Sequence, residues 1–297
     1  VAGVNITIPT GEVGSDPLIK IRGQVGSISG NNTPLILLDN VEIPSIQMVN
    51  PNDVQSISVL KDAASSSIYG SKAAFGVILI TTKSGAQSDK FEVSYSNNFS
   101  WQDPAKKIEI GGIEALQYTL DAQTNRREPM PAGGFWRISP ESLEKAIEWQ
   151  NLYGGKVKWN DPVVYGRDWF YDGKDKYGYR LYDGAKAMIK NWTPTMTHNL
   201  SVNGKSGKTS YNIGLGYLDQ SGMSKTAKKD DFKRYNASVS VTSEINKYIT
   251  VRASSIYSDR NKRYPGIGNT TADPWLYLYR WSPLMPMGVT ENGNPLK

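Results

Sequence analysis

The stretch VQSISVLKDAASSSIYGSKAAFGVILITTKSG, residues 54–85, decides the fold. Residues 57–60 are a short run that favours a β-strand. Asp62 can cap the Ala- and Ser-rich run that follows, and Gly70 supplies the positive φ that a helix C-terminus favours. The four large apolar residues 77–80 predict a second strand buried on both faces. The segment therefore predicts a strand–helix–strand unit in an α/β core.

Residues that support catalysis are scarce in this 297-residue chain. The segment 54–85 has no Gly-rich phosphate loop, nucleophile elbow or metal-ligand pair. The chain has no cysteine and one histidine, His198, which excludes disulfides, thiolate chemistry and multi-His metal sites. We find no pair of carboxylates placed for glycoside hydrolysis. We therefore expect no catalytic residues, no metal and no cofactor.

Charge and hydropathy narrow the class of protein further. The net charge is +6, but Lys and Arg are scattered, whereas a nucleic-acid groove requires a dense basic stripe. No apolar run approaches the roughly 20 residues that a membrane helix requires. Membrane β-barrels remain possible because their strands alternate and keep the mean hydropathy low. We expect no nucleic-acid partner.

Strict alternation of apolar and polar residues begins after residue 88. It predicts strands at residues 91–101, 196–204, 210–218, 235–243 and 249–258. One face of each strand is apolar with aromatic ends, and the other face is small and polar. The apolar face includes Tyr211, Ile213, Leu215 and Val239.

Two architectures give this alternation. A soluble β-sandwich turns its apolar face inward, and a membrane barrel turns it toward lipid. Periodicity alone does not separate them. Connection lengths favour the barrel, because the segments around residues 205–208 and 244–247 are short turns, whereas 102–195 and 219–234 are long.

The insertion at residues 102–195 is far longer than an ordinary loop. Two helices are predicted in it, at residues 111–126 and 139–154, with Ser139 and Gly154 at the ends of the second. Aromatic side chains cluster around these helices. Their packing within the insertion is favoured over a ligand-facing surface, but four remain candidates for contact with a substrate or partner: Trp136, Trp159, Trp169 and Tyr171.

Several motifs together resemble one family. They are IRG at 21–23, PLILLDNVEI at 34–43, NPNDVQSISVLKDAASSSIYGSKAAFGVILITTKSG at 50–85, HNLSVNG at 198–204, YNIGLGYLDQSG at 211–222 and FKRYN at 232–236. The chain resembles the SusC-like (RagA-like) TonB-dependent outer-membrane transporters of Bacteroidetes-type bacteria. The motifs run through most of the chain except the insertion.

The resemblance implies a mixed α/β plug domain at residues 1–88, followed at 89–297 by the N-terminal part of an antiparallel transmembrane β-barrel. Such transporters have about 22 strands, so the chain is expected to be part of a longer protein. The family also has an N-terminal energy-coupling segment, which we do not expect among these residues. The insertion at 102–195 would lie on the extracellular side. The plug motif would be carried by Arg22, Gly23, Asp39, Lys61, Asp62, Tyr69, Gly70 and Gly76.

The implied function is active import of a bulky nutrient, an oligosaccharide or a peptide, across the outer membrane. The implied partners are a SusD-like surface lipoprotein, the TonB–ExbB–ExbD energy-coupling complex, outer-membrane lipid and lipopolysaccharide. The alternatives are a TonB-dependent receptor for a siderophore or vitamin, and a soluble β-rich glycan-binding domain. Where members of the family often have Asp-Gly, this chain has Asp39-Asn40, and Asn also tolerates the left-handed conformation that such a turn requires.

Overall fold

The computed structural model describes residues 3–8, 13–21, 33–85, 91–105, 109, 111–125, 138–171, 173, 176–225, 227–264, 282–285, 288 and 290–294. Contacts divide the chain into two compact units. The first comprises residues 1–102, 192–222 and 229–264, and the second comprises 103–191, 223–228 and 265–297. Three of the predicted site residues, Arg22, Gly23 and Trp136, lie outside the described residues.

The quoted stretch forms the strand–helix–strand unit that the sequence predicts. Its strands are β5 (Val54–Leu60) and β6 (Val77–Thr82), in a sheet of order β4-β3-β6-β5. β3 (Leu35–Leu38) pairs with β6 in parallel, and the other pairs are antiparallel. Both Val77 and Ile78 are buried, which confirms the prediction of a strand covered on both faces.

The helical part of the unit is short and kinked. α1 (Ala63–Ser66) continues into the 3-10 helix η3 (Ser67–Ala73), and the break falls at Gly70 with φ 67°. Gly76 has φ 92°, and a Cβ atom there would lie 2.7 Å from Ile21 Cδ1. Both positions therefore favour glycine, one for its φ alone and the other for φ and space.

The turn between β3 and β4 (Val41–Glu42) uses Asp39 and Asn40, both with positive φ. This is the conformation of a tight hairpin turn, and it confirms that Asn replaces the usual glycine there. A separate hairpin is formed by β1 (Val4–Thr7) and β2 (Leu18–Ile21). Ile19 and Ile21 of β2 pack into the core beside Ile78 and Ile80 of β6.

Two short 3-10 helices, η1 (Ile46–Met48) and η2 (Pro51–Asp53), lead into β5. The side chain of Ser45 caps η1 and that of Asn50 caps η2, each by accepting a backbone N–H bond. Neither helix is predicted from the sequence.

The five predicted long strands form one antiparallel sheet of order β13-β12-β11-β10-β7. The strands are β7 (Glu92–Gln102), β10 (Thr193–Ser206), β11 (Thr209–Ser221), β12 (Asp231–Asn246) and β13 (Ile249–Arg263). Most extend beyond the predicted limits, so the connection after β11 is shorter than expected. Short turns join β10 to β11 and β12 to β13, and the long connections all leave the opposite end of the sheet.

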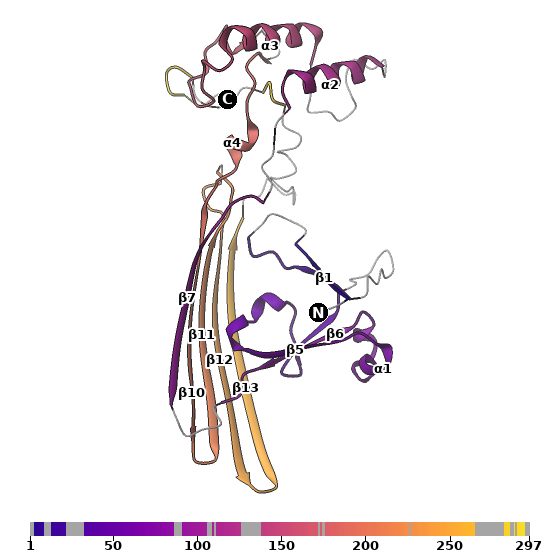
Figure 1. Ribbon diagram of the computed structural model, residues 1–297, viewed down its shortest axis with the longest axis vertical. Helices are drawn as coiled ribbons and strands as arrows, with labels where there is room; N and C mark the ends of the chain where they lie inside the picture. The colour runs from indigo at the N-terminus through magenta and orange to yellow at the C-terminus, as the bar shows by residue number, and fades with distance from the viewer. Residues whose placement is uncertain are drawn as a thin grey trace. The chain divides into compact units, whose positions relative to one another are not determined.

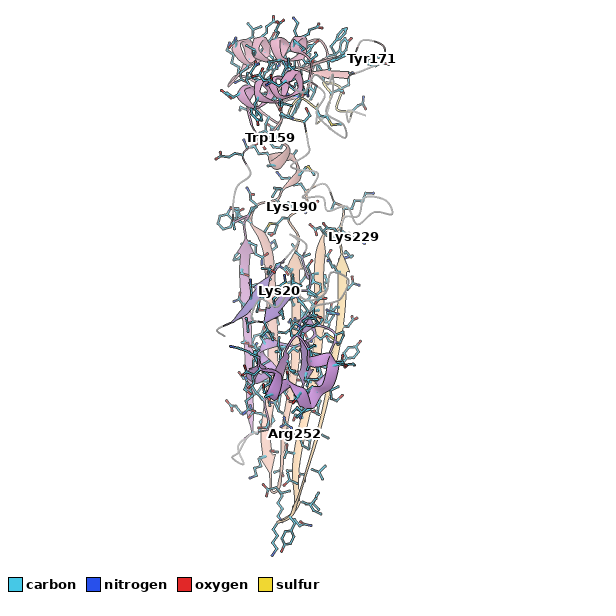
Figure 2. The ribbon with its side chains drawn as sticks, turned by 90° about the vertical axis from the view of Figure 1, so that its right-hand side faces the viewer. Lys20, Trp159, Tyr171, Lys190, Lys229 and Arg252 are labelled. Carbon is cyan, nitrogen blue, oxygen red and sulfur yellow. The ribbon has the colours of Figure 1, made fainter. Side chains whose placement is uncertain are left out.

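The two faces of this sheet have different surroundings. The elements β1, β5, β6 and α1 lie on one face, as Figure 1 shows. Figure 2, viewed from that side, shows their side chains in front of the strands. The apolar side chains of the other face remain exposed in the described residues, among them Tyr95, Leu215, Val239 and Tyr257.

The second unit contains the predicted helices α2 (Ile113–Asn125) and α3 (Pro140–Tyr153), with Ser139 capping α3 as predicted. It also contains β8 (Trp169–Tyr171), β9 (Lys176–Gly178) and α4 (Gly184–Met188), which were not predicted. Leu284, distant in sequence, packs with Leu116 and Leu143 in its core. No helix among the described residues is long and apolar enough to cross a membrane.

Candidate functional site: the seam between the plug and the strands

A band of polar contacts joins the N-terminal α/β part of the first unit to the five-stranded sheet. We call it the seam. On the N-terminal side it comprises Ser15, Asp16, Asp39, Ser45, Gln47, Met48, Asn50, Asn52, Asp53 and Thr82; on the strands it comprises Ser96, Asn199, Arg234, Asn236, Ser238, Arg252, Arg260 and Lys262. Ser96, Asn199, Asn236, Ser238 and Arg252 belong to the polar face that the sequence predicts. Arg234, Arg260 and Lys262 lie beyond the predicted strand limits, in the observed extensions of β12 and β13.

Residues 47–53, which include η2, supply most of the hydrogen bonds that involve amide or backbone groups. Two backbone carbonyls accept from the strands: Gln47 O from Arg234 Nη1 and Met48 O from Asn236 Nδ2, both at 2.8 Å. Two asparagine side chains donate to the strands: Asn50 Nδ2 to Asn199 Oδ1 at 2.9 Å, and Asn52 Nδ2 to Ser96 Oγ at 3.4 Å. The Asn-Pro-Asn-Asp sequence thus combines a helix cap with side chains that reach the sheet.

Asp53 lies against both β11 and β12. Ser238 Oγ donates a 2.8 Å hydrogen bond to Asp53 Oδ2. A Cβ atom at Gly214 would lie 2.4 Å from Asp53 Oδ1, so glycine in β11 leaves room for the carboxylate. Burial raises the pKa of Asp53 above its usual value, although the Ser238 hydrogen bond and the charge of Lys83 act in the opposite direction.

The charged contacts of the seam lie at two levels of β13. Arg260 Nη1 is 3.5 Å from Asp16 Oδ1 and donates to Ser45 Oγ at 3.2 Å. Nearer the start of the strand, Arg252 Nη2 is 3.8 Å from Asp39 Oδ1. These ion pairs are partly exposed, so they orient the surfaces more than they stabilise them.

The predicted plug-motif residues serve several roles. Asp39 accepts the backbone N–H of Thr82 at 3.0 Å and also the Thr82 hydroxyl, which ties the β3–β4 turn to β6. Tyr69 packs against a core cluster that contains Leu37 and Val77. Lys61 follows β5, and the carbonyl of Asp62 accepts the backbone N–H of Ser66 at 3.0 Å.

The aromatic candidates in the insertion lie in different surroundings. Trp159 is 51% exposed, and Lys225 Nζ lies 5.5 Å from its ring centroid. Trp169 is half-buried and meets Tyr165 edge to face, with ring centroids 5.1 Å apart. Tyr171 is 44% exposed and donates to Gly173 O at 2.7 Å.

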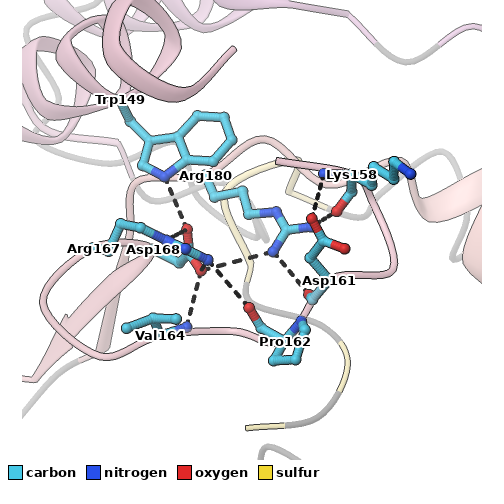
Figure 3. Close-up of polar contacts among 8 residues, drawn as sticks. All are labelled: Trp149, Lys158, Asp161, Pro162, Val164, Arg167, Asp168 and Arg180. Atoms are coloured by element: carbon cyan, nitrogen blue, oxygen red, sulfur yellow. Dashed lines mark hydrogen bonds and ion pairs between the residues drawn. The ribbon is translucent and has the colours of Figure 1, made fainter. Parts of the chain in front are cut away.

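A buried ionic cluster centred on Asp168 directly precedes Trp169 and Tyr171 in the sequence, and Figure 3 shows its contacts. Asp168 Oδ1 accepts Trp149 Nε1 at 2.9 Å and Arg167 Nε at 3.0 Å. Asp168 Oδ2 accepts Val164 N at 2.9 Å and Arg167 Nη2 at 2.7 Å, and lies 3.7 Å from Arg180 Nη1. Burial acts to raise the pKa of Asp168, but the hydrogen bonds from these groups outweigh it and hold the pKa below its usual value.

Arg180 extends this cluster to the chain after α3. Its guanidinium donates to Asp161 O at 3.1 Å and to Lys158 O, and it lies 5.1 Å from the centroid of the Tyr182 ring. Sequence reasoning missed the cluster, because nothing local pairs residue 168 with residue 180. The charged pair Arg167-Asp168 between aromatic residues was the only available signal.

His198 lies on the apolar face of β10, as the sequence predicts. Its Nδ1 is 2.7 Å from Tyr95 Oη, and its ring is 5.6 Å from Phe99 and 6.2 Å from Tyr217. His198 therefore packs as one member of a group of aromatic rings on that face. Within the described residues, no group of three His, Asp or Glu side chains could hold a metal ion.

Comparisons with known proteins agree with this geometry. A sequence profile of the TonB-dependent Receptor Plug Domain matches residues 1–77. The chain is 27% identical to the TonB-dependent receptor SusC of Bacteroides thetaiotaomicron over 250 residues, which cover 81% of this chain and 20% of SusC. It is 29% identical to the TonB-dependent receptor P26 of Formosa agariphila over 279 residues, which cover 91% of this chain and 24% of P26.

Solved structures give the same result. The RagAB peptide importer in its closed-closed state matches with a TM-score of 0.65 and 27% identity, over 100% of this chain and 32% of that one. Its open-open state matches with a TM-score of 0.64 and 26% identity, over 90% and 28%. The chain therefore spans about a quarter of the length of its curated relatives. Together, the plug profile, the receptor relatives and the RagAB structures support the identification of this chain as a fragment of a SusC-like TonB-dependent receptor.

Proposed function

We propose that the chain is the plug and the first barrel strands of a receptor that imports a bulky nutrient across the outer membrane of a Gram-negative bacterium. Residues 1–88 would form the plug domain, and residues 89–297 would form the N-terminal part of the barrel. The insertion at 102–195 would be extracellular. The relatives are TonB-dependent receptors, which supports the receptor class, and RagAB is a peptide importer.

The observation that carries this proposal is the opposite character of the two faces of the sheet. The polar face makes the seam, whereas the apolar face is exposed. On β11 the apolar face runs from Tyr211 to Tyr217, six residues or about 20 Å at about 3.4 Å per residue. The tyrosine at each end of this face matches the aromatic girdles that flank the lipid-facing band of outer-membrane barrels.

The same observation counts against the soluble β-sandwich. A sandwich covers the apolar faces of its sheets, but the described α/β elements pack on the polar face here. The siderophore or vitamin receptor would share both plug and strands with a nutrient importer, and no observation in the described residues favours it.

The partners follow from the proposed role. TonB–ExbB–ExbD would supply energy by pulling on the plug. Lipid and lipopolysaccharide would cover the apolar face. A SusD-like lipoprotein would contact the insertion, where Trp159 and Tyr171 are exposed. The cluster around Asp168 would keep the rings beside it in fixed positions, which lowers the cost of binding.

The proposal requires the plug to move relative to the strands, and a disulfide across the seam tests this in the full-length receptor. A Cβ atom at position 214 lies 2.9 Å from Asp53 Cγ, so Asp53→Cys with Gly214→Cys brings two cysteines within reach. We expect oxidation to abolish TonB-dependent uptake of labelled peptide and labelled oligosaccharide. A reductant should restore uptake of whichever one is carried.

The matched control is Thr209→Cys with Ser243→Cys, which pairs two strands within the sheet, where the hydroxyl oxygens are 2.9 Å apart. This disulfide should form equally well and leave uptake unchanged. Normal uptake through receptors fully cross-linked between positions 53 and 214, or equal uptake without TonB, would contradict the proposed function.

A further inference from the structure

A cavity of about 360 Å³ opens in the plug, bounded by β2, β3 and the segment that enters η1. Its volume is at the lower end of the range for small-molecule sites, which is about 300–1,000 Å³. Its lining is largely aliphatic and includes Ile19, Leu35, Ile43 and Ile46, together with three prolines. None of the described lining residues is aromatic.

Charged groups of both signs stand at the rim of the cavity. Glu42 and Lys72 line it and form a 2.6 Å ion pair, with 52% and 67% of their side chains exposed. Asp16 and Ser45 also line it, and both contact Arg260 of β13. The Asp16–Arg260 pair is 3.5 Å apart and partly exposed. Because both pairs are solvated, a ligand can replace either partner at little cost.

We propose that this cavity binds a short peptide with free termini, and thus that the imported nutrient is a peptide rather than an oligosaccharide. This inference rests on the proposed transport function. An aliphatic side chain of the peptide enters the isoleucine- and proline-lined interior. The peptide ammonium group binds Glu42. The carboxylate binds Lys72 of the rim and Arg260, which contacts the lining residues Asp16 and Ser45.

The chemistry of the lining separates the two substrate classes. A sugar presents C–H faces that stack on flat aromatic rings, and the described lining has no such ring. A neutral sugar also has no charged group to match the rim. A zwitterion with an apolar side chain matches both the interior and the rim, so complementarity of charge and of polarity favours the peptide.

The position of the cavity suits a substrate sensor. Arg260 lies near the Arg263 end of β13, from which the long connection leaves. In the proposed topology that end faces outward, toward incoming substrate. A peptide carboxylate on Arg260 would compete with Asp16, so that binding would weaken one contact of the seam.

The test uses the full-length receptor in detergent and isothermal titration calorimetry. The probes are trileucine, N-acetyl-trileucine amide and maltotriose. We expect trileucine to bind, the blocked peptide to bind at least tenfold more weakly, and maltotriose not to bind over the same concentrations. Glu42→Gln should weaken trileucine about tenfold and leave the blocked peptide unchanged, because only an unblocked terminus pairs with the carboxylate.

Two further variants keep the test decisive. Pro44→Trp places a large ring at an exposed position of the lining and should abolish binding of both peptides. Glu244→Gln, near the β12–β13 turn, serves as the charge-matched control and should change nothing. Three results would each overturn the peptide site. The first is maltotriose binding that is lost in Pro44→Trp. The second is trileucine binding that neither Glu42→Gln nor Pro44→Trp changes, and the third is no binding of trileucine. Uptake that still requires TonB in that case would leave the proposed function intact.

Discussion

At the scale of single residues, the seam depends on side chains whose burial is only partly compensated. Asp53 is the main case, because a carboxylate held against Gly214 and Ser238 has lost water and gained one side-chain hydrogen bond. Such a group does not hold two surfaces permanently together. It is suited to an interface that must separate again.

Asp53→Asn tests this view of the seam. A carboxyl whose folded pKa is raised contributes stability below its unfolded pKa, and the contribution is lost as pH rises through the folded value. The ionised wild-type group is therefore a cost at about pH 7, which asparagine lacks. We expect the variant to unfold at an equal or higher temperature at neutral pH, and the difference to shrink as pH falls toward about 4. Tryptophan fluorescence would follow the transition, and a variant that is weaker only at neutral pH would contradict the argument.

Asp168 is the opposite case, because its lowered pKa makes the ionised form the stabilising one. This contribution is present above the unfolded pKa and is lost as pH falls through the folded value. Asp168→Asn leaves Arg167 and Arg180 without their anion, and we expect a loss of about 3–5 kcal/mol in the insertion. Hydrogen exchange at the amides of β8 and β9 would report it. Asp161→Asn, which removes only an exposed contact to the Lys158 amide, should leave the same amides protected.

At the scale of elements, β6 organises the plug, since it pairs with β3 on one side and β5 on the other. Ile78→Asp places a charge on a side chain that is 3% exposed and should cost several kcal/mol. We expect little or no receptor in the outer membrane, as measured by immunoblot of membrane fractions. Ile57→Asp, on the exposed edge strand β5, is the matched control and should assemble at close to normal levels. Normal amounts of Ile78→Asp protein would disprove the central placement of β6.

The elements that sequence predicted are those with a strong local signal. Strands β7 and β10–β13 alternate over many residues, and α3 has a serine cap and a terminal glycine. The missed elements lack such signals. The three-residue strands β8 and β9 are too short for a period, and the cluster around Asp168 depends on Arg180, which lies twelve positions away.

The seam was missed for a related reason. Alternation placed Asn199 and Ser238 on a polar face, but it could not identify their partners Asn50 and Asp53 far away in the sequence. The glycines of YNIGLGYLDQSG were read only as small residues of that face. Gly214 and Gly216 make room for Asp53 and Asn50, which becomes visible only when the N-terminal segment and β11 are both in place.

At the scale of the whole molecule, every described turn and connection follows one rule. The turns at 207–208 and 247–248 are short and leave one end of the five-stranded sheet, and the connections at 103–192 and 222–230 are longer and leave the other. Outer-membrane barrels have short periplasmic turns and long extracellular loops. The end of the sheet that carries the insertion is therefore the proposed outer end.

Cysteine labelling of intact cells tests this orientation, because these 297 residues contain no cysteine that would react with the probe. The probe is a membrane-impermeant maleimide, applied to full-length receptors with one cysteine each. Because Tyr171 and Lys229 lie in the long connections, Tyr171→Cys and Lys229→Cys should be modified. Ser206→Cys and Lys247→Cys, at the two short turns, should react only after the cells are broken, which also shows that those thiols are accessible. If positions 206 and 247 were labelled in intact cells and positions 171 and 229 were protected, the true orientation would be the opposite of the proposed one. It would also place the peptide cavity on the side away from incoming substrate.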